Sequence, residues 1–249
     1  MAKTERADVL LVSQGQCETR EKAKRLIMAG EVMHGTMKVS KPSTKLPLDS
    51  VLVVKNKPKY VSRAGLKLEG ALEQFPIKVE GITAVDIGSS TGGFTDCLLQ
   101  NGAHKVHAVD VGTNQLVYKL RTDPRVNVME QFNARYMEVE DLGEQVDLAV
   151  MDVSFISLTR IWPAAKKVLK PGGQLVALIK PQFELSREEV SAGKGIIKDP
   201  LLHEKAIEKM RSFNSEELHM EWVEVCDSPI TGTDGNKEFL VWLKMPLND

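Results

Sequence analysis

AVDIGSSTGGFTDCLLQNG, residues 84–102, is a short apolar strand that leads through a glycine-rich turn into a helix. The strand runs out through Asp86, the chain turns at Gly88, and the helix begins at Gly92-Gly93. A strand, a tight glycine turn and a helix are the first half of a βαβ unit. Ligands of such sheets bind outside the carboxyl ends of the strands, so this turn is a candidate cofactor loop.

Strand-like and helical segments alternate on both sides of this stretch. Further strands are predicted near 82–87, 105–110, 126–130, 146–152 and 175–180, and helices at 63–75, 93–101, 114–121 and 159–169. A helix at 201–213 and strands at 219–227 and 237–245 follow, and these two strands are close enough to pair antiparallel at the sheet edge. Such alternation predicts an α/β fold, a mostly parallel sheet with an antiparallel last strand and helices on both faces.

The N-terminal part of the chain has a different pattern. Two short helices are expected in ADVLLVSQG (7–15) and TREKAKRLIMAG (19–30), followed by short β-like pieces up to about Val54. Thr19 is placed to cap the second helix and Gly30 to end it. The polar, proline-bearing segment 55–59 reads as a linker. The sequence therefore predicts a small α+β domain at residues 1–58 and a larger α/β domain at residues 59–249.

Charge is distributed unevenly between these two parts. Residues 1–67 hold 14 Lys and Arg against 6 Asp and Glu, whereas residues 68–249 hold 19 against 28, although the whole chain has a net charge of −1. Clustered positive charge is typical of proteins that bind a polyanion such as nucleic acid or an anionic membrane. A solvated basic surface is the simpler alternative, and we favour a polyanion partner.

Composition excludes several classes of protein. No apolar stretch approaches the ~18 residues needed to span a bilayer, and the charged N-terminus does not resemble a secretory signal peptide. The three cysteines are too few and too scattered for a disulfide framework or a zinc site, and the five histidines show no metal-ligand spacing. We therefore expect a cytoplasmic protein with no membrane segment and no metal.

The glycine turn favours one cofactor class over another. Its spacing differs from the G-x-G-x-x-G fingerprint, which weighs against a nicotinamide or flavin cofactor. Asp110 ends the next strand about 20 residues on, where an acidic residue binds ribose hydroxyls, and Asn133 follows a third strand. Two strand-end carboxylates and a glycine loop without a phosphate-binding lysine suit S-adenosylmethionine, a cationic nucleoside. The predicted cofactor-binding residues are Asp86, Gly88, Ser89, Gly92, Gly93, Phe94, Asp110 and Asn133. The alternative is a plain βα turn in which Asp86 caps the helix.

Two charged residues end the predicted strands at 146–152 and 175–180. Asp152 and Lys180 are expected to lie side by side at the carboxyl ends of neighbouring buried strands, where an ion pair makes both tolerable. On these two residues alone, a purely structural pair is the slightly better interpretation. Amino-group methyltransferases usually carry Asn/Asp-Pro-Pro-aromatic where this chain has Asp-Val-Ser-Phe, so methylation of nitrogen is disfavoured.

Several motifs, in order along nearly the whole chain, resemble one family. YVSRAGLKL, VDIGSSTGGFTD, MDVSF, IKPQFE and SPITG…GNKEFLVWL are similar to the TlyA-type haemolysin and ribosomal RNA methyltransferases, in which an S4 RNA-binding domain is fused to an FtsJ-like methyltransferase. The resemblance implies a Rossmann-like domain that uses S-adenosylmethionine. It also implies that Lys67, Asp152, Lys180 and Glu238 match the Lys-Asp-Lys-Glu tetrad of ribose 2′-O-methyltransferases.

The resemblance also implies that the N-terminal domain binds RNA. Its stretches around Arg6 and around residues 19–23 are similar to S4 domains, and Arg6, Arg20, Lys22 and Lys24 are the candidate RNA contacts. The expected activity is 2′-O-methylation of ribosomal RNA, free or within ribosomal subunits. Two alternatives are a membrane-damaging haemolysin, which the absence of a membrane segment disfavours, and a non-catalytic RNA-binding protein. Residues 186–199, charged and glycine-bearing, are expected to form a loop that acts as a lid.

Overall fold

The computed structural model describes residues 3–17, 19–55 and 58–247 of the chain. The chain divides into two compact units, residues 1–58 and 59–249. The expected linker at 55–59 spans the division, and its residues 56 and 57 lie outside the described residues.

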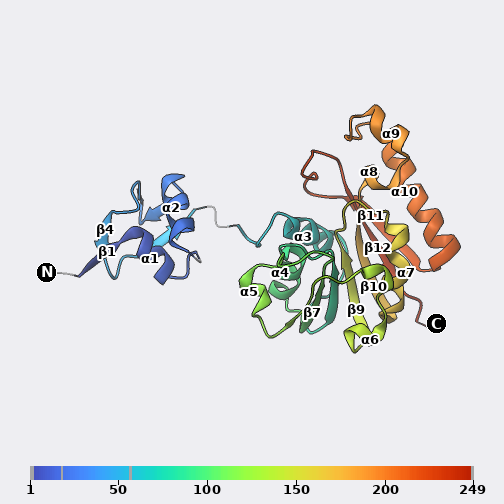
Figure 1. Cartoon of the computed structure of the whole chain (residues 1–249), viewed down its shortest axis with the longest axis horizontal. Helices are drawn as coiled ribbons and strands as arrows, with labels where there is room; N and C mark the ends of the chain where they lie inside the picture. The colour runs from blue at the N-terminus through green and yellow to red at the C-terminus, as the bar shows by residue number, and fades with distance from the viewer. Residues whose placement is uncertain (1–2, 18, 56–57, 248–249) are drawn as a thin grey trace. The chain divides into compact units, whose positions relative to one another are not determined.

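The N-terminal unit is a small α+β domain built around two helices (Figure 1). Its elements are β1 (Thr4–Arg6), α1 (Ala7–Ser13), α2 (Arg20–Met28), β2 (Val32–His34), β3 (Met37–Lys38), β4 (Lys45–Pro47) and β5 (Leu52–Val54). The Thr19 hydroxyl accepts the Lys22 backbone N–H at 3.2 Å, so the predicted cap of α2 is confirmed. Leu10, Leu11 and Ile27 form the core with residues of β2 and β5. The pairing of β1 with β4 is not evident in the sequence pattern.

The second unit is a seven-stranded sheet in the order β11-β12-β10-β9-β6-β7-β8. The strands are β6 (Thr83–Ile87), β7 (Lys105–Val109), β8 (Val126–Met129), β9 (Val146–Met151), β10 (Leu169–Ile179), β11 (Glu221–Asp227) and β12 (Phe239–Lys244). Strands β10, β9, β6, β7 and β8 pair in parallel, whereas β12 runs antiparallel between β10 and β11. The predicted mostly parallel sheet with an antiparallel last strand is confirmed.

Helices cover both faces of this sheet (Figure 1). They are α3 (Ala64–Gln74), α4 (Gly93–Gln100), α5 (Tyr118–Arg121), α6 (Val139–Leu142), α7 (Trp162–Lys167), α8 (Pro181–Glu184), α9 (Arg187–Ala192) and α10 (Pro200–Phe213), with short turns η1 (Ala134–Tyr136), η2 (Leu158–Arg160) and η3 (Asn214–Leu218). Alternate strand residues face opposite sides: Leu148 packs with α3 and α4, and Ala149 packs with α7. Burial on both faces explains the continuous apolar strands.

Two expected helices are shorter than the sequence suggested. The helix expected at 114–121 begins only at Tyr118, because the Glu130 carboxylate accepts the backbone N–H groups of residues 114–116 and holds them as a loop. The helix expected at 159–169 is split into η2 and α7, which ends at Lys167 because β10 already begins at Leu169.

The expectation of a loop at 186–199 was also partly wrong. The segment contains α9, because Ser186 and Glu189 form a reciprocal capping box at the start of this helix. Within β10, the Pro171-Gly172-Gly173 turn forms a bulge between Leu169 and Gln174, so the strand is longer than predicted.

Candidate active site

Strands β9 and β10 deliver the first two polar residues of the site. The strands pair in parallel up to Ala177 and Met151, so the residues that follow them emerge at the same edge of the sheet. There Lys180 Nζ lies 2.6 Å from Asp152 Oδ1 and donates to the Ser154 hydroxyl at 2.9 Å. The side chains of Lys180 and Asp152 are only 8% and 14% exposed, so each charge needs the other as a partner.

Helix α3 and the start of β12 bring the remaining two predicted residues to the same place. Lys67 Nζ lies 2.7 Å from Glu238 Oε2 and 3.3 Å from Asp152 Oδ2. The four side chains therefore form one row of alternating charge, Glu238–Lys67–Asp152–Lys180, to which α3, β9, β10 and β12 contribute. We name this row the charged row. Neighbours of opposite charge make this degree of burial tolerable for all four groups.

The charged row lines an open cavity of about 730 Å³. Asp86, Gly88, Ser89 and Phe94 of the predicted cofactor loop line the same cavity. Two ammonium groups fixed by carboxylates at a cavity wall are preorganised to stabilise negative charge that develops on a bound oxygen. The arrangement suits transfer of a group to a hydroxyl.

Asp86 lies almost entirely buried beneath this cavity, at 1% exposure. Its Oδ2 accepts the backbone N–H of Thr95 at 2.9 Å and the Thr95 hydroxyl at 2.6 Å. Among the described residues Oδ1 has no hydrogen-bond partner. Burial raises the pKa of Asp86 to about 7, although the two bonds from Thr95 oppose that rise. A buried carboxylate that is only half satisfied favours a cationic ligand nearby.

A second cavity, of about 530 Å³, holds the other predicted cofactor residues, Asp110 and Asn133. Asp110 accepts the backbone N–H of Gly112 at 2.7 Å and that of Ser90 at 2.8 Å, one on each carboxylate oxygen. Each oxygen keeps a lone pair for a further donor. Gly88 and Asp152 line both cavities, so the two hollows adjoin at the end of β6. One ligand can therefore reach from Asp110 to the charged row.

The glycines of the loop have different tasks. A Cβ on Gly88 would lie 2.9 Å from the backbone oxygen of Asp152, and its φ of +82° favours glycine, so this residue lets the two strand ends approach. Gly92 and Gly93 do not line either cavity. A Cβ there would meet Leu120 at 2.3 Å or Ser62 Oγ at 2.4 Å, so their size serves the packing of α4 rather than contact with a ligand.

Two aromatic residues of the larger cavity, Phe155 and Phe183, were not among the site residues predicted from the sequence. Phe155 is 92% exposed, adopts φ +63°, and its ring lies 5.3 Å from that of Phe183. Both residues line the larger cavity. An exposed phenylalanine in a left-handed conformation is costly and points to a binding role. The motif MDVSF contains Phe155, but the sequence alone does not show that this side chain is exposed or that its backbone is left-handed.

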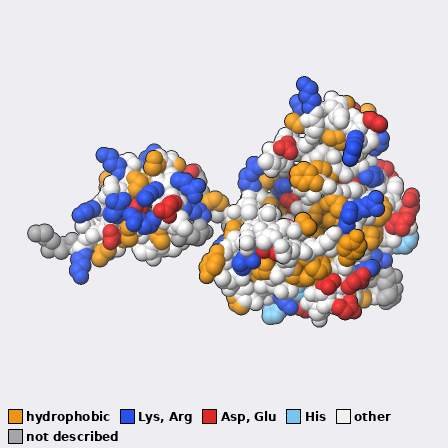
Figure 2. Space-filling model, viewed as in Figure 1, with side chains coloured by type: hydrophobic (Ala, Val, Ile, Leu, Met, Phe, Trp, Pro, Cys, Tyr) orange, Lys and Arg blue, Asp and Glu red, His pale blue; other side chains and the backbone are white. Residues whose placement is uncertain are grey.

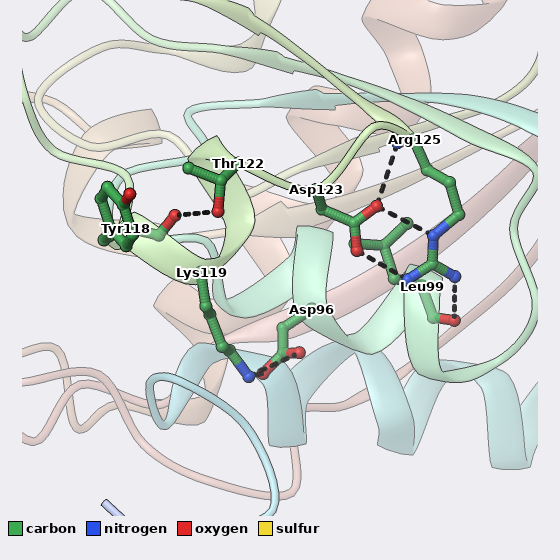
Figure 3. A network of polar contacts seen from close by, with 7 residues as sticks. All are labelled: Asp96, Leu99, Tyr118, Lys119, Thr122, Asp123 and Arg125. Atoms are coloured by element: carbon green, nitrogen blue, oxygen red, sulfur yellow. Dashed lines mark hydrogen bonds and ion pairs between the residues drawn. The ribbon is translucent and has the colours of Figure 1, made fainter. Parts of the chain in front are cut away.

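A network of polar contacts fastens the short helix α5 beside the loop (Figure 3). Lys119 Nζ contacts both carboxylate oxygens of Asp96 at 3.2 Å. Asp96 also accepts the backbone N–H of Val61 at 2.9 Å. Asp96 therefore joins α4, α5 and the segment that leads into α3.

The candidate RNA contacts of the N-terminal unit lie partly in ion pairs. Arg6 Nε is 2.9 Å and the Arg20 guanidinium 3.1 Å from the buried carboxylate of Asp8, and the two arginine side chains remain 40% and 51% exposed. The hydrogen bond from Arg6 is the main reason that the pKa of Asp8 falls to about 2. Lys22 is exposed and Lys24 is half-buried. Figure 2 shows Lys and Arg side chains gathered on the visible face of this unit.

Two kinds of feature are absent from the described part of the chain. Within residues 3–17, 19–55 and 58–247, no helix has the length and apolar character needed to cross a bilayer. Across those residues, no group of three or more His, Cys, Asp or Glu side chains is placed to hold a metal ion.

Comparison with known proteins gives matches over nearly the whole chain. A family model described as FtsJ-like methyltransferase matches residues 60–245, and one described as S4 domain matches residues 5–52. The candidate rRNA methyltransferase YqxC of Bacillus subtilis is 51% identical, over 98% of this chain and 87% of its own. The 16S/23S rRNA (cytidine-2′-O)-methyltransferase TlyA of Mycobacterium tuberculosis is 41% identical, over 98% and 91%. A solved structure of a candidate hemolysin from Streptococcus thermophilus is 49% identical, with a TM-score of 0.74 over 99% of this chain and 90% of that one.

Proposed function

Since the chain belongs to the FtsJ-like methyltransferase family, in the TlyA-type group that adds an S4 domain, we propose that it methylates the ribose 2′-hydroxyl of ribosomal RNA. The charged row of Lys67, Asp152, Lys180 and Glu238 at one cavity wall is the observation that carries this proposal. The name of the Mycobacterium relative supports a cytidine as the target. Ribosomal RNA as substrate implies the cytoplasm as the compartment.

The proposed cofactor is S-adenosylmethionine, and the two adjoining cavities fit it. When bound, this cofactor supplies a methyl group activated by a positively charged sulfur. Asp110 is the proposed acceptor for the ribose hydroxyls and Asn133 the proposed neighbour of the adenine. Asp86, whose Oδ1 has no hydrogen-bond partner among the described residues, favours positive charge at the other end of the cofactor. Gly88, Ser89 and Phe94 line the same cavity as the charged row and are the proposed contacts at that end of the cofactor, and Gly92 and Gly93 shape the loop.

The charged row is proposed to prepare the substrate hydroxyl. Lys180 holds that hydroxyl and stabilises the negative charge that develops on its oxygen, while Asp152 orients Lys180 through the 2.6 Å contact. Lys67, fixed between Asp152 and Glu238, is a second cation at the same wall. Holding the hydroxyl in line with the methyl carbon adds the rate enhancement expected from proximity and orientation. We propose that one of the two lysines, in its neutral form, accepts the proton that the hydroxyl loses as the methyl group is transferred.

The two units are proposed to divide the work. Residues 1–58 form an S4-like RNA-binding domain and residues 59–249 the methyltransferase domain, in line with the two family models. Arg6, Arg20, Lys22 and Lys24 are the proposed phosphate contacts. A buried carboxylate that fixes two half-exposed guanidinium groups reduces the side-chain entropy lost when those groups bind phosphate.

Methyl transfer to separated ribosomal subunits tests the proposal. Purified protein, S-adenosylmethionine with a labelled methyl group and each subunit are combined, and the RNA is digested to nucleosides. We expect label in a 2′-O-methylated nucleoside, with cytidine as the first candidate. Tight cofactor or RNA binding without transfer to any subunit would favour the non-catalytic alternative. Leakage of lipid vesicles that persists in Asp86→Asn protein would favour the haemolysin alternative.

A further inference from the structure

Glu184 is a buried carboxylate outside the charged row, at the end of α8. Its side chain is 1% exposed. One oxygen accepts the Ser157 hydroxyl at 2.5 Å, and the other accepts the Leu158 backbone N–H at 2.8 Å. Lys209 of α10 contacts the carboxylate at 3.2 Å and also donates to the backbone oxygen of Glu184 at 2.6 Å. These contacts therefore connect α8 to the start of η2, through Ser157 and Leu158, and to α10, through Lys209.

These contacts join two segments that carry residues of the site. Ser157 and Leu158 lie at the end of the turn that holds Asp152, Ser154 and Phe155, whereas Glu184 lies four residues after Lys180. We name residues 152–158 the site turn. Glu184 thus fastens the site turn to the segment that bears the reactive lysine.

The site turn needs such a fastening. The φ of +63° at Phe155 is unfavourable for a residue other than glycine, and persists only where its surroundings impose it. Three other contacts cross the same gap: Lys180 to Asp152 at 2.6 Å and to the Ser154 hydroxyl at 2.9 Å, and the ring of Phe183 to that of Phe155 at 5.3 Å. All three lie at the cavity, where a bound substrate competes for them. Glu184, Ser157 and Leu158 do not line the cavity, so the contacts among them are free of that competition.

The ion pair with Lys209 contributes less to holding the site turn than the hydrogen bonds from Ser157 and Leu158. Lys209 is 43% exposed, and an ion pair with a solvent-exposed ammonium contributes little to stability. The hydrogen bond that Glu184 accepts from Leu158 is buried and the one from Ser157 is partly buried, and both are charge-assisted, which makes them the stronger contacts.

From this geometry we propose that Glu184 is a positioning residue for methyl transfer. It holds Ser154 and Phe155 against Lys180, and so fixes the cavity wall on which the target nucleotide rests. This inference depends on the proposed function for its kinetic consequence, but the anchoring of the turn does not.

The test compares Glu184→Gln with Lys209→Met. Glutamine keeps the size but has no negative charge, so both bonds to the site turn lose their charge assistance, and the Ser157 hydroxyl has to accept from the amide NH2 instead of donating. Lys209→Met removes the ion pair and the hydrogen bond to the Glu184 backbone oxygen, and leaves both bonds between Glu184 and the site turn in place. We expect Glu184→Gln to lower kcat/KM for ribosomal RNA on the order of 10–100-fold, the range for a small misplacement near the reacting groups. Cofactor affinity, measured by calorimetry, should stay within about twofold, and Lys209→Met should change kcat/KM by less than about threefold.

A double variant separates positioning from general stability. If Glu184 acts through Phe155, Glu184→Gln should cost much less in protein that already carries Phe155→Ala, because coupled residues are not additive. Additive losses, or a Glu184→Gln rate equal to wild type, overturn the inference. If Glu184→Gln unfolds at the assay temperature, Ser157→Ala replaces it and should show the same coupling with a smaller loss.

Amide hydrogen exchange gives a readout that needs no activity. We expect faster exchange across residues 153–161 in Glu184→Gln but not in Lys209→Met. Unchanged exchange in both variants contradicts the anchoring. Wild-type protein that transfers no methyl group refutes the proposed function instead, and the exchange rates then decide by themselves whether Glu184 holds the turn.

Discussion

Asp152 lies between two cations, since Lys180 contacts one of its oxygens at 2.6 Å and Lys67 the other at 3.3 Å. A substitution of Asp152 would leave both buried lysines without this carboxylate at the same time, so its effect could not be assigned to Lys67 or to Lys180. Asp110 is a cleaner probe, because its carboxylate contacts only backbone N–H groups in the described structure and lines the other cavity.

Asp110→Ala should weaken binding of S-adenosylmethionine by about 1–3 kcal/mol, the loss expected when buried ribose hydroxyls are deprived of a charged acceptor. Calorimetry measures this directly. Asp123→Ala removes a carboxylate that pairs with Arg125 away from both cavities, and serves as the control. Equal cofactor affinity of the Asp110→Ala and wild-type proteins would contradict the assignment of Asp110 to the cofactor site.

Asp86 links two elements of the fold, because it is the penultimate residue of β6 and the bonds that it accepts from Thr95 fasten α4 to that strand. Burial raises its pKa to about 7 from an ordinary value near 3.8. Between these two pH values the folded protein holds a proton that the unfolded chain has released. The free energy of unfolding should therefore fall as pH rises from about 4 to about 7, and level off above that.

Asp86→Asn should remove this dependence, because asparagine still accepts both bonds from Thr95 and does not titrate. Thermal unfolding of both proteins at intervals between pH 4 and pH 8, without ligand, measures the effect. The difference in Tm, wild type minus Asp86→Asn, should decrease up to about pH 7. A constant difference would show that the carboxylate of Asp86 is ionised throughout.

Elements with strong local signals were predictable from the sequence. The inner strands and helices α3, α4 and α10 were expected close to their observed bounds, because their apolar patterns are long and uninterrupted. The loop before α5 was not, because the Glu130 carboxylate that holds it comes from a later part of the chain. Helix α9 was missed although Ser186 and Glu189 have the spacing of a capping box, since charge and glycine dominate that segment.

The candidate site divides in the same way. The strand-end positions of Asp86, Asp110, Asp152 and Lys180 follow from the predicted topology alone. Lys67 and Glu238 were reached only through the family resemblance, because nothing local ties α3 or the start of β12 to the strand ends. The contacts of Glu184 could not be predicted from the sequence, because they join three elements that meet only in the folded unit.

At the scale of the whole molecule, the two units carry opposite charge. The basic residues concentrate in the N-terminal part and the acidic ones in the methyltransferase domain. The family matches divide the chain accordingly, and the TlyA-type family expected from the motifs is confirmed. This separation predicts that RNA affinity and cofactor affinity respond to different substitutions.

Arg20→Ala combined with Lys24→Ala should weaken RNA binding and leave cofactor affinity unchanged. Binding of phosphate groups releases counterions, so the slope of log affinity against log salt should shrink by up to about 0.9 for each phosphate that is no longer bound, borrowing the value for duplex DNA. Lys205→Ala with Arg211→Ala removes the same charge from α10 and is the matched control. If the slope is unchanged in Arg20→Ala/Lys24→Ala and reduced in Lys205→Ala/Arg211→Ala, the phosphate contacts lie on the methyltransferase domain and not on the N-terminal unit.

Lys180→Met tests the central claim, that the charged row performs methyl transfer to a ribose hydroxyl. Methionine keeps an apolar stem of similar length without the charge, and Asp152 keeps Lys67 as a partner, so the fold should survive. Cofactor binding should persist, because Asp110 lies in the adjoining cavity.

The measurement is the single-turnover rate of methyl transfer to the ribosomal subunit that the wild-type protein modifies, with cofactor affinity and thermal unfolding recorded on the same samples. A folded, cofactor-bound Lys180→Met protein should react at least ~100-fold more slowly, the scale for removing one preorganised electrostatic or acid–base group. A rate near that of wild type would make Lys180 half of a structural ion pair, and would contradict the assignment of the charged row as the catalytic site.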